Sequence, residues 1–229
     1  MTLLAHAIAA APPASISHEG LRGRRLSWSE AGDLGLWSTD WAPDIKLERP
    51  DALAHHRLVE RICAAQPCLP VRFGTAFATS DEARASLNRR AAALHAALTR
   101  VAGKSELALT LLWSKSEDLA SSPPSAPQLE GPGRNYMEAR RAEFAAREAR
   151  RTRAESLVEQ VIADLAIERQ LVWHETCTSE NVAVSLAVLV PTEHSLERKS
   201  ELVRIAGQFT DVVPVVNGPW PPYTFARIE

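Results

Sequence analysis

The chain has 229 residues, of which 45% are hydrophobic and 24% are charged, a balance typical of globular proteins and too apolar for a disordered chain. The formal net charge of −2 gives no electrostatic reason to expect binding to nucleic acid or to an anionic membrane. No apolar run approaches the roughly 18–20 residues that a membrane-spanning helix needs. The length favours two domains of roughly 100 residues each.

The N-terminal segment, residues 3–10, is predicted to be a buried strand rather than a signal peptide. No basic segment precedes it, His6 interrupts the short apolar run, and Pro12 and Pro13 then end the strand. Short strands joined by turns are expected over residues 16–41, followed by an amphipathic helix over residues 50–65. The inward face of that helix is predicted to consist of Ala52, His56, Val59, Ile62 and Cys63.

The next predicted helix begins at Thr79, which can form a capping box with Glu82, and ends at Gly103. Apolar residues recur at helical spacing between these two ends. The segment 107–113 is short and nearly all apolar, which predicts a strand buried on both faces.

The remaining elements are an exposed proline-rich loop over 121–133, a long charged helix over 135–168, and three strands with one further helix. The order from residue 107 is strand, helix, strand, strand, helix, strand, which is the split βαβ arrangement of a ferredoxin-like domain. The predicted strands after the long helix cover 171–177, 182–190 and 211–216. Interleaved arginines and glutamates predict a solvated, salt-bridged face on the long helix.

We therefore predict an α+β protein of two domains. The first is an N-terminal α+β domain over residues 1–103. The second, over 104–229, is ferredoxin-like, with a four-stranded antiparallel sheet and both helices on one face. It contains the insertion at 121–133 and ends in an extended tail at 218–229, and strands 107–113 and 182–190 are expected to lie in one sheet.

Residues able to carry chemistry are few. Cys63, Cys68 and Cys177 are an odd number for a disulfide framework, which favours a reducing cytoplasm. Their spacing does not fit a zinc site with His55 and His56 either. No phosphate-binding loop or nucleophile elbow occurs, so the chain is predicted not to be an enzyme and to hold no cofactor.

Two segments stand out, and in the first of them Arg72 lies between apolar residues. Because a buried guanidinium must be paired, we expect a carboxylate or several carbonyl groups around Arg72. In the second segment, three prolines within four residues predict an extended tail that docks on the protein's own body; a free tail that binds a partner is the alternative. The candidate structural or partner-binding residues are Leu69, Pro70, Arg72, Phe73, Gly74, Gly218, Pro219, Trp220, Pro221, Pro222 and Tyr223.

These segments, LPVRFGTAF at 69–77 and GPWPPYTF at 218–225, resemble the signature segments of the gas vesicle GvpF/GvpL family. GRNYMEARR at 133–141 is similar to a third family segment, with Met137 in place of the usual leucine. The resemblance implies two α+β domains and a cytoplasmic accessory protein of gas vesicle formation. Such a protein would bind the hydrophobic shell protein and other accessory proteins as an adaptor or chaperone, without nucleic acid or membrane partners. The alternative is a ferredoxin-like ligand-binding or regulatory module, although the predicted strands carry no concentrated set of polar groups.

Overall fold

The computed structural model describes residues 2–12, 16–42, 45–114 and 132–227, so most of the insertion predicted at 121–133 lies outside the described residues. The chain divides into two compact units. The first unit contains residues 1–106, 189–193 and 219–229, and the second contains 107–188 and 194–218. The last residues of the chain therefore cluster with the first unit, although they follow the second in sequence.

A five-stranded sheet forms the centre of the first unit, with the strand order β2-β3-β1-β4 and with β5 also paired to β1. The strands β1 and β3 are antiparallel and buried along nearly their whole length, because helices cover both faces of the sheet. The predicted first strand is thus confirmed. The strands are β1 (Thr2–Ala9), β2 (Leu26–Ala31), β3 (Leu34–Trp41), β4 (Leu69–Pro70) and β5 (Ala76–Phe77).

The helix α1 (Arg49–Ala65) begins with a reciprocal capping box between Glu48 and Asp51. The predicted helix is confirmed, but its inward face is predicted correctly only in part. Val59 and Ile62 are buried as predicted, whereas the predicted Ala52, His56 and Cys63 are half-buried. The residues buried on α1 are Asp51, His55, Leu58, Val59 and Ile62.

The prediction of a single helix between Thr79 and Gly103 is wrong, because this segment forms two helices, α2 (Ser80–Arg89) and α3 (Ala91–Val101). The backbone leaves the helical region at Arg90 (φ −115°, ψ 13°), while the apolar spacing continues across the break and hides it in the sequence. The predicted ends are confirmed. Thr79 Oγ1 accepts a hydrogen bond from Glu82 N at 3.1 Å, and Gly103 has a φ of +69°.

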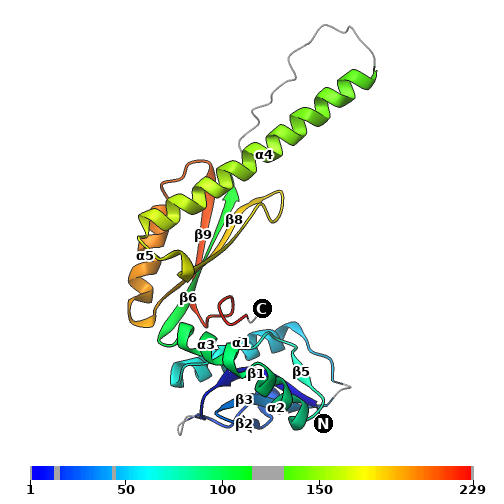
Figure 1. Ribbon diagram of the computed structural model, residues 1–229, viewed down its shortest axis with the longest axis vertical. Coiled ribbons are helices and arrows are strands. Elements are labelled where there is room, and N and C mark those ends of the chain that lie inside the picture. Colours follow the sequence, from blue (N-terminus) through cyan, green and yellow to red (C-terminus); the bar gives the residue numbers. More distant parts are fainter. Residues whose placement is uncertain (1, 13–15, 43–44, 115–131, 228–229) are drawn as a thin grey trace. The chain divides into compact units, whose positions relative to one another are not determined.

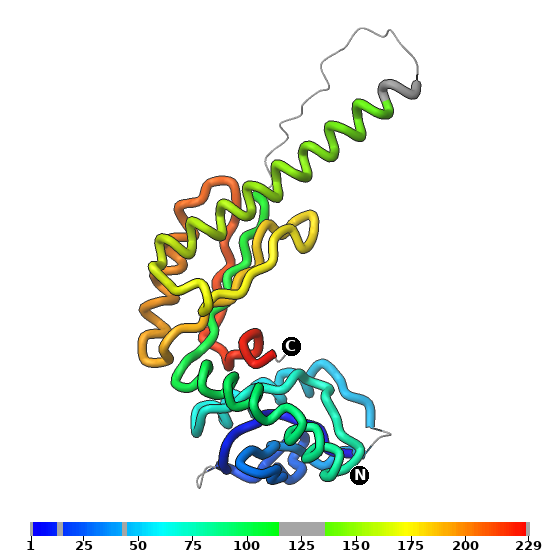
Figure 2. Tube along the Cα trace, viewed as in Figure 1, coloured from blue at the N-terminus to red at the C-terminus, as the bar shows by residue number. Residues whose placement is uncertain are grey.

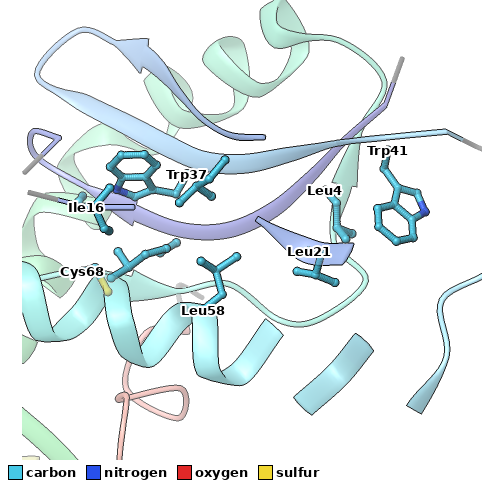
Figure 3. Packing of buried hydrophobic residues seen from close by; sticks show 11 residues of the cluster. Leu4, Ile16, Leu21, Trp37, Trp41, Leu58 and Cys68 are labelled. Atoms are coloured by element: carbon cyan, nitrogen blue, oxygen red, sulfur yellow. The ribbon is translucent and has the colours of Figure 1, made fainter. Parts of the chain in front are cut away.

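The core between α1 and the sheet contains two tryptophans that the sequence did not assign to any role. Trp37 and Trp41 are almost fully buried beside Leu4, Leu21 and Leu58 (Figure 3). Trp41 Nε1 donates a hydrogen bond to Ile45 O at 2.9 Å, which satisfies the indole in an apolar surrounding. These tryptophans therefore have a structural role in the first unit.

Gly35 lies directly under the ring of Trp28. A Cβ atom added at Gly35 would be 2.1 Å from Trp28 Cζ2, and Trp28 itself packs against Trp37 with the ring centroids 5.2 Å apart. We expect Gly35→Ala to lower the free energy of unfolding by about 1–3 kcal/mol, measured by urea denaturation, because the indole cannot move away freely. In a Trp28→Ala background the same substitution should cost much less; an equal cost in both backgrounds would contradict this packing.

The second unit contains a four-stranded sheet with the order β7-β8-β6-β9. Strands 107–113 and 182–190 lie in this one sheet, as predicted, and α4 and α5 pack against it (Figure 1). The chain is thus a mixed α/β fold with antiparallel sheets. The elements are β6 (Lys104–Trp113), α4 (Pro132–Asp164), β7 (Val172–Thr176), β8 (Val182–Pro191), α5 (Ser195–Ala206) and β9 (Val212–Trp220).

The helix α4 has two dissimilar halves. Its residues from 136 to 152 are exposed, whereas Ala154, Leu157 and Val161 are buried. On the exposed half, Glu143 pairs with Arg147 at 2.6 Å and with Arg140 at 3.5 Å, which confirms the predicted salt-bridged face. Within the described part of the chain, no helix is both long and apolar enough to span a membrane.

Candidate functional site

The first recognised segment forms a loop at the edge of the sheet in the first unit. Leu69 and Pro70 pair with β1 before the loop, and Ala76 and Phe77 pair with β1 after it. The intervening residues 71–75, here called the arginine loop, leave the regular ladder. Two hydrogen bonds still tie them to β1, from Val71 N to His6 O (2.8 Å) and from Ala5 N to Thr75 O (2.9 Å). Gly74, with a φ of +86°, provides the turn.

A hydrogen-bonded network of buried side chains contacts the arginine loop. His6 Nδ1 lies 3.0 Å from His55 Nδ1, and His6 Nε2 lies 2.8 Å from Thr39 Oγ1. His55 Nε2 in turn lies 3.0 Å from Val71 O, in the arginine loop. The network joins β3, β1, α1 and the loop, and we call it the histidine relay (Thr39, His6, His55 and the carbonyl of Val71).

The chemistry of the last acceptor fixes the proton positions in the histidine relay. A carbonyl oxygen only accepts, so His55 Nε2–H is the donor to Val71 O. In a neutral His55 the other nitrogen, Nδ1, is then an acceptor, and His6 Nδ1–H must donate to it. His6 Nε2 therefore accepts from the hydroxyl of Thr39, whose oxygen accepts in turn from Leu21 N at 3.4 Å. Protonation of both rings would place two N–H groups against each other at the contact between His6 Nδ1 and His55 Nδ1.

The pKa values agree with two neutral rings. Burial, with the charge of His55 as a smaller cause, lowers the pKa of His6 to about 3, and burial also lowers the pKa of His55. The unfolded histidines take up protons below about pH 6.5, whereas the folded ones resist protonation. The contribution of the two neutral histidines to the free energy of unfolding is therefore fully present above that pH and decreases as the pH falls below it.

We expect the free energy of unfolding to fall by about 2 kcal/mol from the His6 contribution alone when the pH is lowered from 7.5 to 5, as measured by urea denaturation. Burial is the main cause that raises the pKa of Glu106, so the folded state binds this proton at a higher pH than the unfolded state does. Glu106 therefore favours the folded state as the pH falls, which opposes the histidine effect. The His6→Gln variant isolates the histidine contribution. If its dependence on pH equals that of the unchanged protein, the neutral relay is wrong.

Arg72 does not lie where the sequence predicted. Exposure alternates along the arginine loop, so Val71 and Phe73 are half-buried while Arg72 is exposed. Phe73 packs edge-on against His55, with the ring centroids 5.4 Å apart. Among the described residues none forms an ion pair or a side-chain hydrogen bond with the Arg72 guanidinium. The predicted buried pairing of Arg72 is therefore wrong, because the loop turns its side chain toward solvent.

The second recognised segment packs within the first unit, but it is not extended throughout. Strand β9 continues to Trp220, and residues 223–226 then form a turn in which Ala226 N donates to Pro222 O at 3.0 Å. The predicted extended form from 218 to 225 is thus wrong beyond Trp220. Figure 2 shows this turn, in red, next to the helices of the first unit. Pro221 and Pro222 are buried, and Phe225 is 6% exposed.

Polar contacts hold this C-terminal turn in place. The buried carboxylate of Glu106 accepts hydrogen bonds from Thr224 N at 2.8 Å and from Thr224 Oγ1 at 2.7 Å. Arg100 Nη2 donates to Phe225 O at 2.6 Å. The ring of His56 stacks on Tyr223 and meets the edge of Trp220, so a helix residue contacts both aromatic side chains.

The arginine loop and the C-terminal turn meet in a pocket of about 920 Å³ within the first unit, which we call the arginine pocket. Three arginines line it, Arg72, Arg90 and Arg227, and sequence reasoning missed the last two because neither belongs to an apolar pattern. Gly218 lies in the second unit, where its carbonyl accepts from Lys199 Nζ at 2.6 Å. The other lining residues are Ile8, Leu36, Ala52, His55, His56, Leu69, Pro70, Val71, Phe73, Thr75, Phe77, Leu94, Tyr223 and Ala226.

Two cysteines lie beside this site in a form that the sequence did not predict. Cys63 and Cys68 form a disulfide, with their Cα atoms 5.4 Å apart, because the chain reverses between the end of α1 and β4. The prediction from the odd number of cysteines that the chain has no disulfide is therefore wrong for this pair. The third cysteine, Cys177, is exposed and free. No group of three or more potential metal ligands occurs among the residues that the structure describes.

The fold is that of solved gas vesicle proteins. The crystal structure of the gas vesicle protein GvpF from Anabaena sp. PCC7120 matches with a TM-score of 0.78 and 19% identity, covering 100% of this chain and 97% of that chain. That of GvpF from Microcystis aeruginosa matches with a TM-score of 0.76 and 18% identity, covering 99% of each chain. No curated protein matches the sequence.

The family follows from the sequence itself. The profile of the family described as gas vesicle synthesis protein GvpL/GvpF matches residues 3–227. The chain therefore belongs to the GvpL/GvpF family of gas vesicle synthesis proteins, and the resemblance seen in the sequence is confirmed.

Proposed function

We propose that this chain is a cytoplasmic, non-enzymatic accessory protein of gas vesicle formation that binds the hydrophobic shell protein and other accessory proteins as an adaptor or chaperone during assembly. Membership of the gas vesicle synthesis family supports a role in gas vesicle formation. The single observation that supports a binding role is the arginine pocket, which combines a largely apolar lining with an exposed, unpaired Arg72. Apolar concave surfaces with a few polar groups are typical of binding sites.

The physical reason for such a partner is the behaviour of a shell subunit before assembly. Exposed apolar surface and unpaired strand edges aggregate when nothing covers them. A protein that holds the subunit until it joins the growing shell would suppress that aggregation. No group in the described arginine pocket needs to react covalently for this role.

Co-expression with the shell protein tests the proposal. The tagged chain is co-expressed with the gas vesicle shell protein of the same organism, and the shell protein is measured in the cleared lysate and after affinity purification. We expect the shell protein to remain in the lysate and to copurify in a fixed ratio, whereas an unrelated protein with the same tag should retain none. A shell protein that sediments in both cases would contradict the proposal.

We also propose that the second unit, residues 107–188 and 194–218, is a ferredoxin-like domain. Its strand order β7-β8-β6-β9 and the two helices packed on the sheet support this assignment. The same arrangement leaves a ferredoxin-like ligand-binding or regulatory module as the second candidate function. Shell-protein binding that is unchanged by substitutions in the arginine pocket but lost on substitutions in the second unit would favour that candidate.

A further inference from the structure

The charges around the arginine pocket are not balanced by its own lining. None of its lining residues is an aspartate or a glutamate, and three are arginines. Among the residues that the structure describes, the Arg90 guanidinium donates to Ser86 alone, to Ser86 Oγ at 3.0 Å and to Ser86 O at 3.5 Å. Two carboxylates lie nearby, because Glu106 interacts with the charge of Arg227, and Glu60 pairs with His56 at 3.3 Å. Neither of them pairs with Arg72.

The rest of the lining limits what an anion in this pocket can be. Leu69, Pro70, Val71 and Phe73 supply an apolar wall, and Tyr223 faces the same space. Two backbone donors of the arginine loop are used within the protein, since Val71 N binds His6 O and Thr75 N binds Arg72 O at 3.1 Å. A phosphate, which is polar on all sides, would meet much apolar surface in this lining. A group with one carboxylate and an apolar body fits both features.

We infer that the arginine pocket binds an apolar peptide segment of a gas vesicle protein through a carboxylate that pairs with Arg72. The inference rests on the proposed function and assigns a site and a chemistry to it. The planar guanidinium matches a carboxylate with two parallel hydrogen bonds, which is why arginine rather than lysine suits this position. The carboxylate belongs either to an acidic side chain or to a chain terminus, and its apolar neighbours contact the lining beside Phe73 and Tyr223.

The histidine relay gives this site its rigidity. The Val71 carbonyl beside Arg72 is held by His55 Nε2–H, and the Phe73 ring after Arg72 packs on His55. Arg72 is thus presented from a loop that is fixed on both sides. A fixed loop loses little conformational entropy when a ligand binds.

The probe is a set of fluorescein-labelled, overlapping 12-residue peptides that span the shell protein and the other gas vesicle proteins of the same gene cluster. Binding to the full-length chain is measured by fluorescence anisotropy. We expect binding peptides to carry an aspartate, a glutamate or a free C-terminus next to apolar residues. Arg72→Glu should weaken them at least about tenfold, because the substitution removes a charge-assisted hydrogen bond and places a negative charge against the carboxylate. Arg72→Lys should restore part of the affinity.

Matched controls separate the possible sources of the effect. Arg57 is an exposed arginine on α1 outside the pocket lining, and Arg57→Glu should leave binding within about twofold. Two changes to the peptide show which carboxylate is used: replacement of its Asp or Glu by Asn or Gln, and amidation of its C-terminus. Loss of binding after either change supports the inference. Equal binding of uncharged peptides, no effect of Arg72→Glu, complete displacement by inorganic phosphate or no binding peptide at all would each overturn it.

The outcome also separates this inference from the proposed function. If the shell protein copurifies equally with the Arg72→Glu variant and no gas vesicle peptide binds through Arg72, the pocket assignment fails and the proposed function stands. If the shell protein does not copurify with the unchanged chain while acidic peptides of another gas vesicle protein bind through Arg72, the pocket assignment stands and the shell-protein role fails.

Discussion

Substitution of His6 by alanine is expected to lower the free energy of unfolding by about 2–5 kcal/mol. The side chain is fully buried and makes two hydrogen bonds, one to His55 and one to Thr39. Its loss leaves the acceptor at His55 Nδ1 and the hydroxyl of Thr39 without their partner, in addition to a cavity. Urea denaturation of the full-length chain, followed by circular dichroism, measures the effect.

The matched control is His18→Ala, because the His18 side chain is exposed in the same unit. It should change stability by no more than about 0.5 kcal/mol. If His6→Ala costs as little as His18→Ala, the relay contributes nothing to stability. His6→Gln should recover part of the loss, since its amide offers both a donor and an acceptor.

Truncation after Trp220 is expected to be the second large perturbation, with a loss of roughly 3–5 kcal/mol in the free energy of unfolding. The deletion leaves strand β9 whole but removes the buried Phe225 and the two donors that Thr224 offers to Glu106. A buried carboxylate without donors is costly. Thermal and urea denaturation of the truncated chain measure the change.

A chain that ends at Arg227 is the matched control and should unfold at the same urea concentration as the full chain, because it keeps all these contacts. The free-tail alternative gives the opposite pattern. An unchanged melting temperature after truncation at Trp220, together with lost copurification of the shell protein, would show that the tail serves only as a ligand. Glu106→Gln keeps most of the packing and should cost less than the truncation.

Local signals in the sequence predicted most of the elements. The N-cap at Thr79 and the helix end at Gly103 depend on neighbours a few residues away, and both are confirmed. The apolar run at 107–113 forms the predicted strand, but the prediction that it is buried on both faces is wrong, because buried and half-buried residues alternate along it. The break at Arg90 was missed because the apolar spacing continues through it. The face of α1 was predicted only in part, with His56 in place of His55, because two adjacent histidines give no periodic signal of their own.

The site was predicted only in part, because it depends on contacts between distant residues. The segments at 69–77 and 218–225 were singled out, and the structure brings most of the first and Tyr223 of the second to one pocket. The histidine relay was missed, although one polar residue in an apolar strand, His6, was a signal that a buried partner must exist. Arg72 was expected to be buried because its neighbours are apolar, yet in an extended loop alternate side chains face opposite ways.

Photo-crosslinking in cells tests the central claim, a direct contact between the arginine pocket and a gas vesicle protein. A photoreactive phenylalanine analogue replaces Thr75, which lines the pocket, in cells that form gas vesicles. We expect a covalent adduct with the shell protein, identified by mass spectrometry, and none from the same analogue at Arg57. No adduct from position 75, or equal adducts from both positions, would contradict it.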